Sequence, residues 1–122
     1  MNAQNYTQKS LQAIQAAQQL TIQNQNQQIE QVHLLSALLQ QDGGLVPQLL
    51  KKMGISVESL DAAVTAEVNK LPRVSGSGRE QGKIYVAQDV DKCLNTAESI
   101  AASMKDEYVS VEHLFLGLLE TA

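Results

Sequence analysis

The chain has 122 residues, of which 43% are hydrophobic, and its formal net charge is -4. This length and apolar content predict one compact domain, since the chain is short for two independent cores. The negative charge, the absence of Trp and the single Phe argue against a nucleic-acid-binding protein, which needs basic and stacking surfaces. The start of the chain lacks the features of a signal peptide, and no apolar run approaches the roughly 18 residues of a membrane span. We therefore expect a cytosolic protein that binds neither nucleic acid nor membrane.

Residues suited to thiol or metal chemistry are scarce. Cys93 is the only cysteine, and the two histidines, His33 and His113, lie on distant segments. A lone cysteine cannot form a disulfide within the chain, and neither a zinc set nor a Cys-His pair has local support. We expect an inert core thiol, no metal, no cofactor, and a binding domain rather than an enzyme.

The sequence up to Leu71 contains four segments with helical periodicity. The first is rich in Gln, and Thr7 before it can accept a hydrogen bond from a free backbone N–H of the first turn. A second helix runs from about Gln31 to Gln41 and ends at Gly43 and Gly44, where a left-handed cap is expected. A third helix stops at Gly54, and Ser56 opens a fourth that ends before Pro72. The apolar residues that mark these helices are Leu11, Ile14, Ala17 and Leu20, then Val46, Leu49, Leu50 and Met53, then Leu60, Val64, Val68 and Leu71.

Helical periodicity resumes after a connector. A fifth helix presents one apolar face, and Ser110 is the expected N-cap of a sixth. The stretch Ile84-Tyr85-Val86 has β character, but it is too short to predict a strand. The apolar residues of the two helices are Val90, Cys93, Leu94, Ala97, Ile100, Ala101 and Met104, then Leu114, Phe115, Leu118 and Leu119.

The connector itself, PRVSGSGREQGK, loses all periodicity and gathers Pro, Gly and Ser. We expect it to be flexible, because Val74 is its only apolar residue. Limited proteolysis should therefore cut first between residues 72 and 83. A first cut within one of the helical segments would contradict this expectation.

The two halves of the chain repeat one another. An offset of 80 in residue number (113 − 33) aligns His33-Leu34 with His113-Leu114, and the register continues without a gap. Two amphipathic helix pairs, each unable to cover its apolar face alone, would bury these faces against one another about a pseudo-twofold axis. Each histidine then stands in the first turn of a helix, where it can cap or hydrogen-bond a neighbouring segment. We predict this structural role rather than proton transfer.

Two further stretches invite functional interpretations. GSGREQGKI is similar to a phosphate-binding loop, but Ser77 replaces its first Gly and Ile84 replaces its Ser or Thr, so nucleotide binding is not expected. In KDEYVSVEHLF, Asp106 and Glu112 lie beside the apolar residues Tyr108 and Val109. Glu112 can simply stabilise the start of a helix. Alternatively, the carboxylates can hold an extended basic and hydrophobic peptide beside an apolar groove.

Three segments resemble the N-terminal repeat domain of the Clp AAA+ unfoldases, most closely the ClpB disaggregase type. They are HLLSALLQQDGG with the LL and GI that follow it, LPRVSGSG, and YVSVEHLFLGLLE. The resemblance implies an all-α, pseudo-twofold fold of about eight helices, with two more helices expected beyond Ala122. The domains would be a first repeat at 1–71, a flexible connector at 72–86 and a truncated second repeat at 87–122.

The resemblance also implies a function. The domain would capture unfolded or aggregated protein substrates for two ATPase modules that use ATP and Mg and form a homohexamer, while the isolated domain would be a monomer. The family's substrate-binding Thr and two acids match Thr7, Asp106 and Glu112, and Tyr6, Leu94 and Leu114 are candidates for the neighbouring apolar groove.

A ClpC-type domain, which docks an adaptor or phosphoarginine-marked substrates for a protease, is the alternative. That type has a Glu before each repeat histidine. Here Glu112 precedes His113 but Val32 precedes His33, which weakens the alternative.

Overall fold

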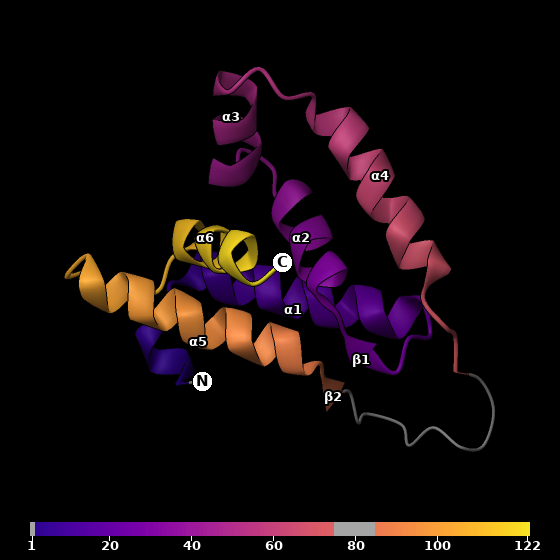
Figure 1. The fold of residues 1–122 in the computed structure, drawn as a ribbon, viewed down its shortest axis with the longest axis horizontal. Helices are drawn as coiled ribbons and strands as arrows, with labels where there is room; N and C mark the ends of the chain where they lie inside the picture. Colours follow the sequence, from indigo (N-terminus) through magenta and orange to yellow (C-terminus); the bar gives the residue numbers. More distant parts are fainter. Residues whose placement is uncertain (1, 75–84) are drawn as a thin grey trace.

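The structure is a computed structural model that describes residues 2–74 and 85–122 (Figure 1). Within these residues it has two strands, a short 3-10 helix (Ala3–Asn5) and six α-helices, which confirms the all-α class. None of these helices is long and apolar enough to cross a membrane. The helices are α1 (Gln8–Gln23), α2 (Gln31–Leu39), α3 (Leu45–Lys52), α4 (Val57–Lys70), α5 (Gln88–Ser103) and α6 (Val111–Thr121), and the strands are β1 (Gln28–Ile29) and β2 (Tyr85–Val86).

The predicted caps account for several helix boundaries. The Thr7 hydroxyl accepts a hydrogen bond from the Ser10 N–H at 3.2 Å, and Ser56 caps α4 in the same way. Gly43 and Gly54 have φ of 62° and 78°, the left-handed conformation in which glycine meets no steric penalty. Gly44 was predicted to share this conformation, but its φ is −70° and it is instead the N-cap of α3.

The structure has two short strands where the sequence allowed no strand to be predicted, and β2 lies in the stretch with β character. Gln28 pairs with Tyr85 and Ile29 pairs with Val86 in a parallel two-stranded sheet. A second, isolated parallel bridge joins Tyr6 to Val109. Each pairing is too short to give a period-2 pattern, so the sequence could not indicate it.

These pairings are related by the predicted repeat. Adding 80 to Ile29 gives Val109, and adding 80 to Tyr6 gives Val86, so each half of the chain supplies one strand to the other half. The backbone N–H of Thr7 donates to the Val109 carbonyl at 2.9 Å, and the N–H of its counterpart Ala87 donates to the Ile29 carbonyl at 3.0 Å. The reciprocal exchange confirms the register of the repeat and its twofold character.

The core lies between the two repeats. In Figure 1, α2 and α6 lie near the centre, with α3 and α4 above them and α5 below. All six helices contribute buried apolar residues to one cluster. Cys93 belongs to this cluster and is fully buried, and burial raises the pKa of its thiol to about 11, as expected for an inert core thiol.

The connector between the repeats is described only in part. Residues 75–84 of the predicted 72–86 connector lie outside the described residues, so its flexibility and the domain boundaries remain predictions. Residues 72–74 contact the first repeat. The Val74 N–H donates to the Gln25 carbonyl at 2.7 Å, and the Asn26 side chain donates to the Pro72 carbonyl at 3.1 Å.

Candidate functional site

The two histidines occupy equivalent places, as predicted. The Nδ1 atom of His33 accepts a hydrogen bond from the Glu30 N–H at 2.8 Å, and Nδ1 of His113 accepts one from the Ser110 N–H at 2.9 Å. Both histidines stand three positions after the N-cap, where Glu or Gln commonly makes this bond. Each therefore satisfies a backbone donor that the start of its helix would otherwise leave free.

The opposite nitrogen of each ring reaches the residue seven positions earlier. Nε2 of His33 lies 2.8 Å from Asn26 Oδ1, and Nε2 of His113 lies 2.9 Å from Asp106 Oδ2. Since Nδ1 already accepts a hydrogen bond, a neutral ring carries its proton on Nε2 and donates it to Asn26 or Asp106. His33 is 0% exposed, and burial lowers its pKa to about 4.

The predicted binding residues Thr7, Asp106 and Glu112 lie around the loop that precedes α6. The side chains of Asp106 and Glu112 approach one another and His113, with their ligand atoms all within 4.8 Å. Thr7 joins the same loop through its bond to the Val109 carbonyl, which also accepts from the Ser10 hydroxyl at 2.9 Å. The structure thus brings the start of α1 to the loop between the two acids, as the repeat predicted.

The three apolar candidates lie in the core. Tyr6 is 4% exposed, Leu94 is 8% exposed and Leu114 is fully buried, so none of them lines an open groove. The Tyr6 hydroxyl has no hydrogen-bond partner among the described residues, and burial, reinforced by the negative charge of Glu98, raises the pKa of the phenol. Contact between a ligand and these side chains would require the core to open.

Asp106, Glu112 and His113 also have the residue types of a metal site. The hydrogen bonds of His113 argue against that use. Its Nδ1 accepts from the Ser110 N–H, so the Nε2 atom that faces the acids carries the ring proton. A metal bound at Nε2 would displace this proton while Nδ1 still accepts from the Ser110 N–H. A neutral imidazole cannot do both, because only one of its two nitrogens has a free lone pair. We assign the cluster to hydrogen bonding and surface charge.

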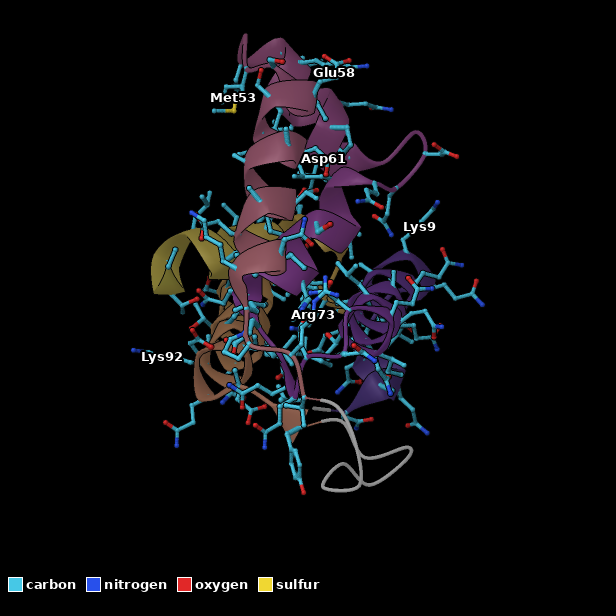
Figure 2. All side chains as sticks on the ribbon, turned by 90° about the vertical axis from the view of Figure 1, so that its right-hand side faces the viewer. Lys9, Met53, Glu58, Asp61, Arg73 and Lys92 are labelled. Carbon is cyan, nitrogen blue, oxygen red and sulfur yellow. The ribbon has the colours of Figure 1, made fainter. Side chains whose placement is uncertain are left out.

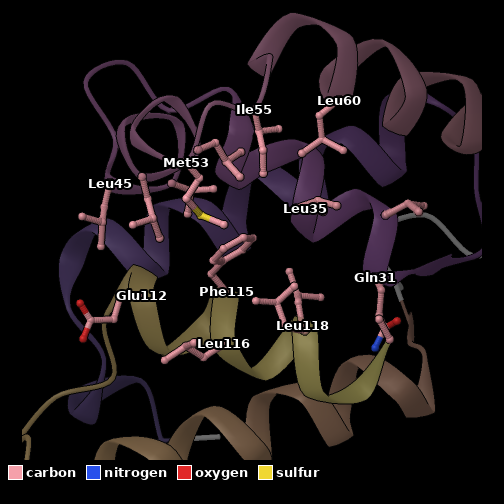
Figure 3. A pocket seen from close by; sticks show the side chains of 16 residues that line it. Gln31, Leu35, Leu45, Met53, Ile55, Leu60, Glu112, Phe115, Leu116 and Leu118 are labelled. Atoms are coloured by element: carbon pink, nitrogen blue, oxygen red, sulfur yellow. The ribbon is translucent and has the colours of Figure 1, made fainter.

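An apolar groove of about 720 Å³ lies between α2, α3 and α6 (Figure 3). Phe115 and Leu118 of α6 point into it, and Met53 faces them from the end of α3. Its other apolar lining residues include Leu35, Leu45, Leu49, Ile55, Leu60, Leu116 and Leu119. Glu112 lies at one end of the groove, so the groove adjoins the cluster of Asp106, Glu112 and His113.

The sequence interpretation did not predict this groove. Leu49 and Met53 were counted among the apolar residues that mark the third helix. Their side chains are nevertheless 38% and 62% exposed. The repeat contained one indication of the groove. Val32 and Glu112 occupy equivalent positions in the two repeats, and both line the groove. The groove therefore crosses the interface between the repeats.

The comparisons with known proteins agree with this architecture. The family profile described as the Clp repeat (R) N-terminal domain matches residues 5–122. The chain belongs to the Clp repeat N-terminal domain family. The Clp repeat relatives include a protein named chaperone protein ClpB from Nitratidesulfovibrio vulgaris, 42% identical over 98% of this chain, and one of the same name from Porphyromonas gingivalis, 42% identical over 99%.

Solved structures share the Clp repeat fold. The N-terminal domain of Hsp104 from Candida albicans matches 96% of this chain and 75% of its own with a TM-score of 0.85 and 24% identity. The N-terminal domain of the ClpV1 ATPase from E. coli matches 96% of this chain and 69% of its own with a TM-score of 0.84 and 20% identity. The chain spans only 13–14% of the length of the two ClpB relatives and corresponds to their N-terminal Clp repeat domain.

Proposed function

We propose that this chain is the substrate-binding N-terminal domain of a cytoplasmic, ATP-dependent ClpB-type disaggregase. In this role it captures exposed hydrophobic segments of misfolded or aggregated proteins and delivers them to a homohexameric ATPase. The observation that carries the proposal is the match to ClpB relatives over 98% of the chain at 42% identity. The ATP and Mg of this activity belong to ATPase modules beyond the Clp repeat, and the domain itself is a binding module.

The groove supports this function. Among the described residues, this surface is lined by exposed Leu, Ile and Met side chains, and it suits flexible apolar segments of many sequences because Met adapts to different shapes. A groove on so small a domain buries limited area, so we expect micromolar or weaker affinity. Weak binding also allows a captured segment to be released to the ATPase.

A substitution on the groove wall tests the proposal. Leu119 is 61% exposed and lines the groove, and Leu119→Gln should weaken capture of a chemically unfolded protein about fivefold. The expected loss of roughly 1 kcal/mol is part of the free energy of burying a leucine side chain. Capture is measured by fluorescence anisotropy with the unfolded protein and, for reference, the same protein in its folded form.

The control is Ile22→Gln, since Ile22 is 41% exposed on α1 and does not line the groove. Both variants should keep the parent melting temperature, because exposed substitutions change stability by about 0.5 kcal/mol or less. Equal capture of folded and unfolded protein by the parent chain would contradict the proposed function. Equal losses in the two variants would contradict the groove as its site.

The number of retained partners distinguishes the proposed function from the ClpC-type alternative. A domain that loads unfolded proteins should retain many unrelated proteins from a heat-aggregated lysate. A domain that docks an adaptor should retain a single partner in a fixed ratio. Quantitative mass spectrometry of the retained proteins distinguishes these results.

A further inference from the structure

The two repeats are joined through equivalent backbone segments. The Thr7 N–H and the Ser10 hydroxyl both donate to the Val109 carbonyl, each at 2.9 Å, and the Val109 N–H donates to the Asn5 carbonyl at 2.8 Å. The counterpart of Val109 in the first repeat is Ile29, which pairs with the second repeat in the same way. The first repeat therefore contains both members of this pairing, and in the folded chain each member is bound to the other repeat.

Two copies of the first repeat can form the same pairings with one another. Residue 29 of each copy then takes the place of Val109 beside residues 5–7 of the other copy. The hydrogen bonds to Val109 use its backbone N–H and carbonyl, so they do not depend on its side chain. Replacing Val109 with Ile29 also keeps a β-branched apolar residue at this position.

The central helices present similar side chains in both repeats. Helix α2 packs against α6 between the repeats. Leu34 and Leu38 of α2 are buried, and their counterparts Leu114 and Leu118 of α6 are buried leucines as well. A second copy of α2 therefore presents leucines at the positions where α6 presents them, and the core of the interface keeps its apolar character.

Tyr6 is the residue whose surroundings would change most. It is 4% exposed and lies beside Cys93 and Glu98 of α5. In a pair of first repeats it would meet the counterparts of these two residues, Ala13 and Gln18. Ala is smaller than Cys, and the Gln amide is neutral and can accept a hydrogen bond from the phenol. The first repeat can therefore accommodate Tyr6 of a second copy.

Charge favours the first repeat over the second as a partner for itself. Residues 1–74, the first repeat and the segment bound to it, contain five Lys or Arg and five Asp or Glu residues, a formal net charge of zero (5 − 5). Residues 85–122 contain two and seven, which gives −5 (2 − 7). Figure 2 shows both signs on the first repeat, with Lys9 on α1, Glu58 at the start of α4 and Arg73 beyond its end. Two first repeats thus meet without net repulsion, whereas two second repeats would repel one another.

We propose that the first repeat is self-complementary and that, when the second repeat is displaced, it binds the first repeat of a second copy of the chain. The two copies form an isologous dimer, in which an exact twofold axis replaces the pseudo-twofold axis of the monomer. In the folded chain the second repeat is covalently attached, so its effective concentration, on the order of millimolar, excludes a second copy. The pairing is open to chains whose second repeat is still being synthesised.

The experiment uses the full chain printed above with its second repeat displaced. The double variant Val109→Asp, Leu118→Asp places two charges at buried positions of the second repeat, where no partner compensates them. We expect this displaced variant to dimerise with a dissociation constant of roughly 10 μM by sedimentation equilibrium, while the parent chain stays monomeric. The matched control is the counterpart variant Ile29→Asp, Leu38→Asp, which carries the same changes in the first repeat and should not dimerise.

A disulfide identifies the pairing. Gln28 pairs with Tyr85, the counterpart of Asn5, so in the dimer Asn5 of one copy lies beside Gln28 of the other. With Cys93→Ala to remove the native thiol, Asn5→Cys and Gln28→Cys should join two copies of the displaced variant under mild oxidation. The same cysteines should not join in a chain with an intact second repeat, because each then lies against that repeat.

Three results would overturn the proposal. The displaced variant could be monomeric, folded or unfolded, at concentrations up to about 100 μM, ten times the expected dissociation constant. It could associate only to the same extent as the counterpart variant, which would indicate non-specific association of exposed core residues. It could also associate without forming the disulfide between positions 5 and 28, which would exclude the exchanged pairing.

Discussion

Replacing Gly117 with Ala is expected to lower the free energy of unfolding by about 2 kcal/mol through overpacking, although Ala is the better helix former. A Cβ at this position would lie 2.7 Å from the Cys93 carbonyl oxygen and 3.3 Å from the Ala97 nitrogen. Both are backbone atoms of α5, so α5 and α6 would have to move apart. Overpacking of this kind costs about 1–3 kcal/mol, and a gain of at most about 1 kcal/mol in helix propensity does not offset it.

The repeat provides a matched control for this substitution. Ala37 is the counterpart of Gly117, and Ala13 is the counterpart of Cys93, so the larger Cys in the second repeat faces the smaller Gly. Ala37→Gly removes a methyl group without a clash and should cost about 1 kcal/mol, mainly through helix propensity. Urea unfolding followed by circular dichroism measures both values. A Gly117→Ala variant as stable as the parent would show that the two helices separate freely.

Protonation of His33 is expected to destabilise the domain by about 3 kcal/mol between pH 7 and pH 4. The folded pKa is about 4, whereas an unfolded histidine has a pKa of 6.5. Below pH 6.5 the unfolded chain therefore binds a proton that the folded chain does not. Stability is full above pH 6.5 and falls as the pH drops toward 4, by about 1.4 kcal/mol for each unit of pKa difference.

The comparison variant is His33→Gln, because a glutamine three positions after the N-cap can also accept the Glu30 N–H. Carboxylates titrate in the same pH range in both proteins, so the difference between their stability profiles isolates the histidine. We expect the profile of the variant to be flatter by about 3 kcal/mol over this range. Parallel profiles, measured by urea unfolding at each pH, would mean that the pKa of His33 in the folded chain does not differ from its value in the unfolded chain.

The helices and the repeat could be predicted because their signals are local or periodic. Thr7 and Ser56 cap the helices they were predicted to cap, and Gly43 and Gly54 have the left-handed backbone. The equivalence of His33 and His113 followed from a fixed offset and needed no knowledge of the packing. Both the cap role and the neighbouring hydrogen bonds repeat in the structure.

The site was less predictable, because exposure depends on contacts between distant segments. Leu94 and Leu114 have the same apolar character as Leu49 and Leu119, yet the first two are buried and the last two line the groove. Periodicity assigns an apolar residue to a face but does not indicate whether another element covers that face. The strands escaped prediction for a related reason, since each is very short and pairs with a distant segment.

The exchanged strands set an order for folding during synthesis. Ile29 of the first repeat pairs with Val86, and Tyr6, near the start of the chain, pairs with Val109, near its end. Neither pairing can form while the ribosome has released only the first repeat, whose helix pair would expose the apolar face that meets the second. Contacts this distant in sequence close late and slowly, because a long loop must first be restricted. The nascent first repeat is thus itself a chain with exposed hydrophobic surface until most of the domain has emerged.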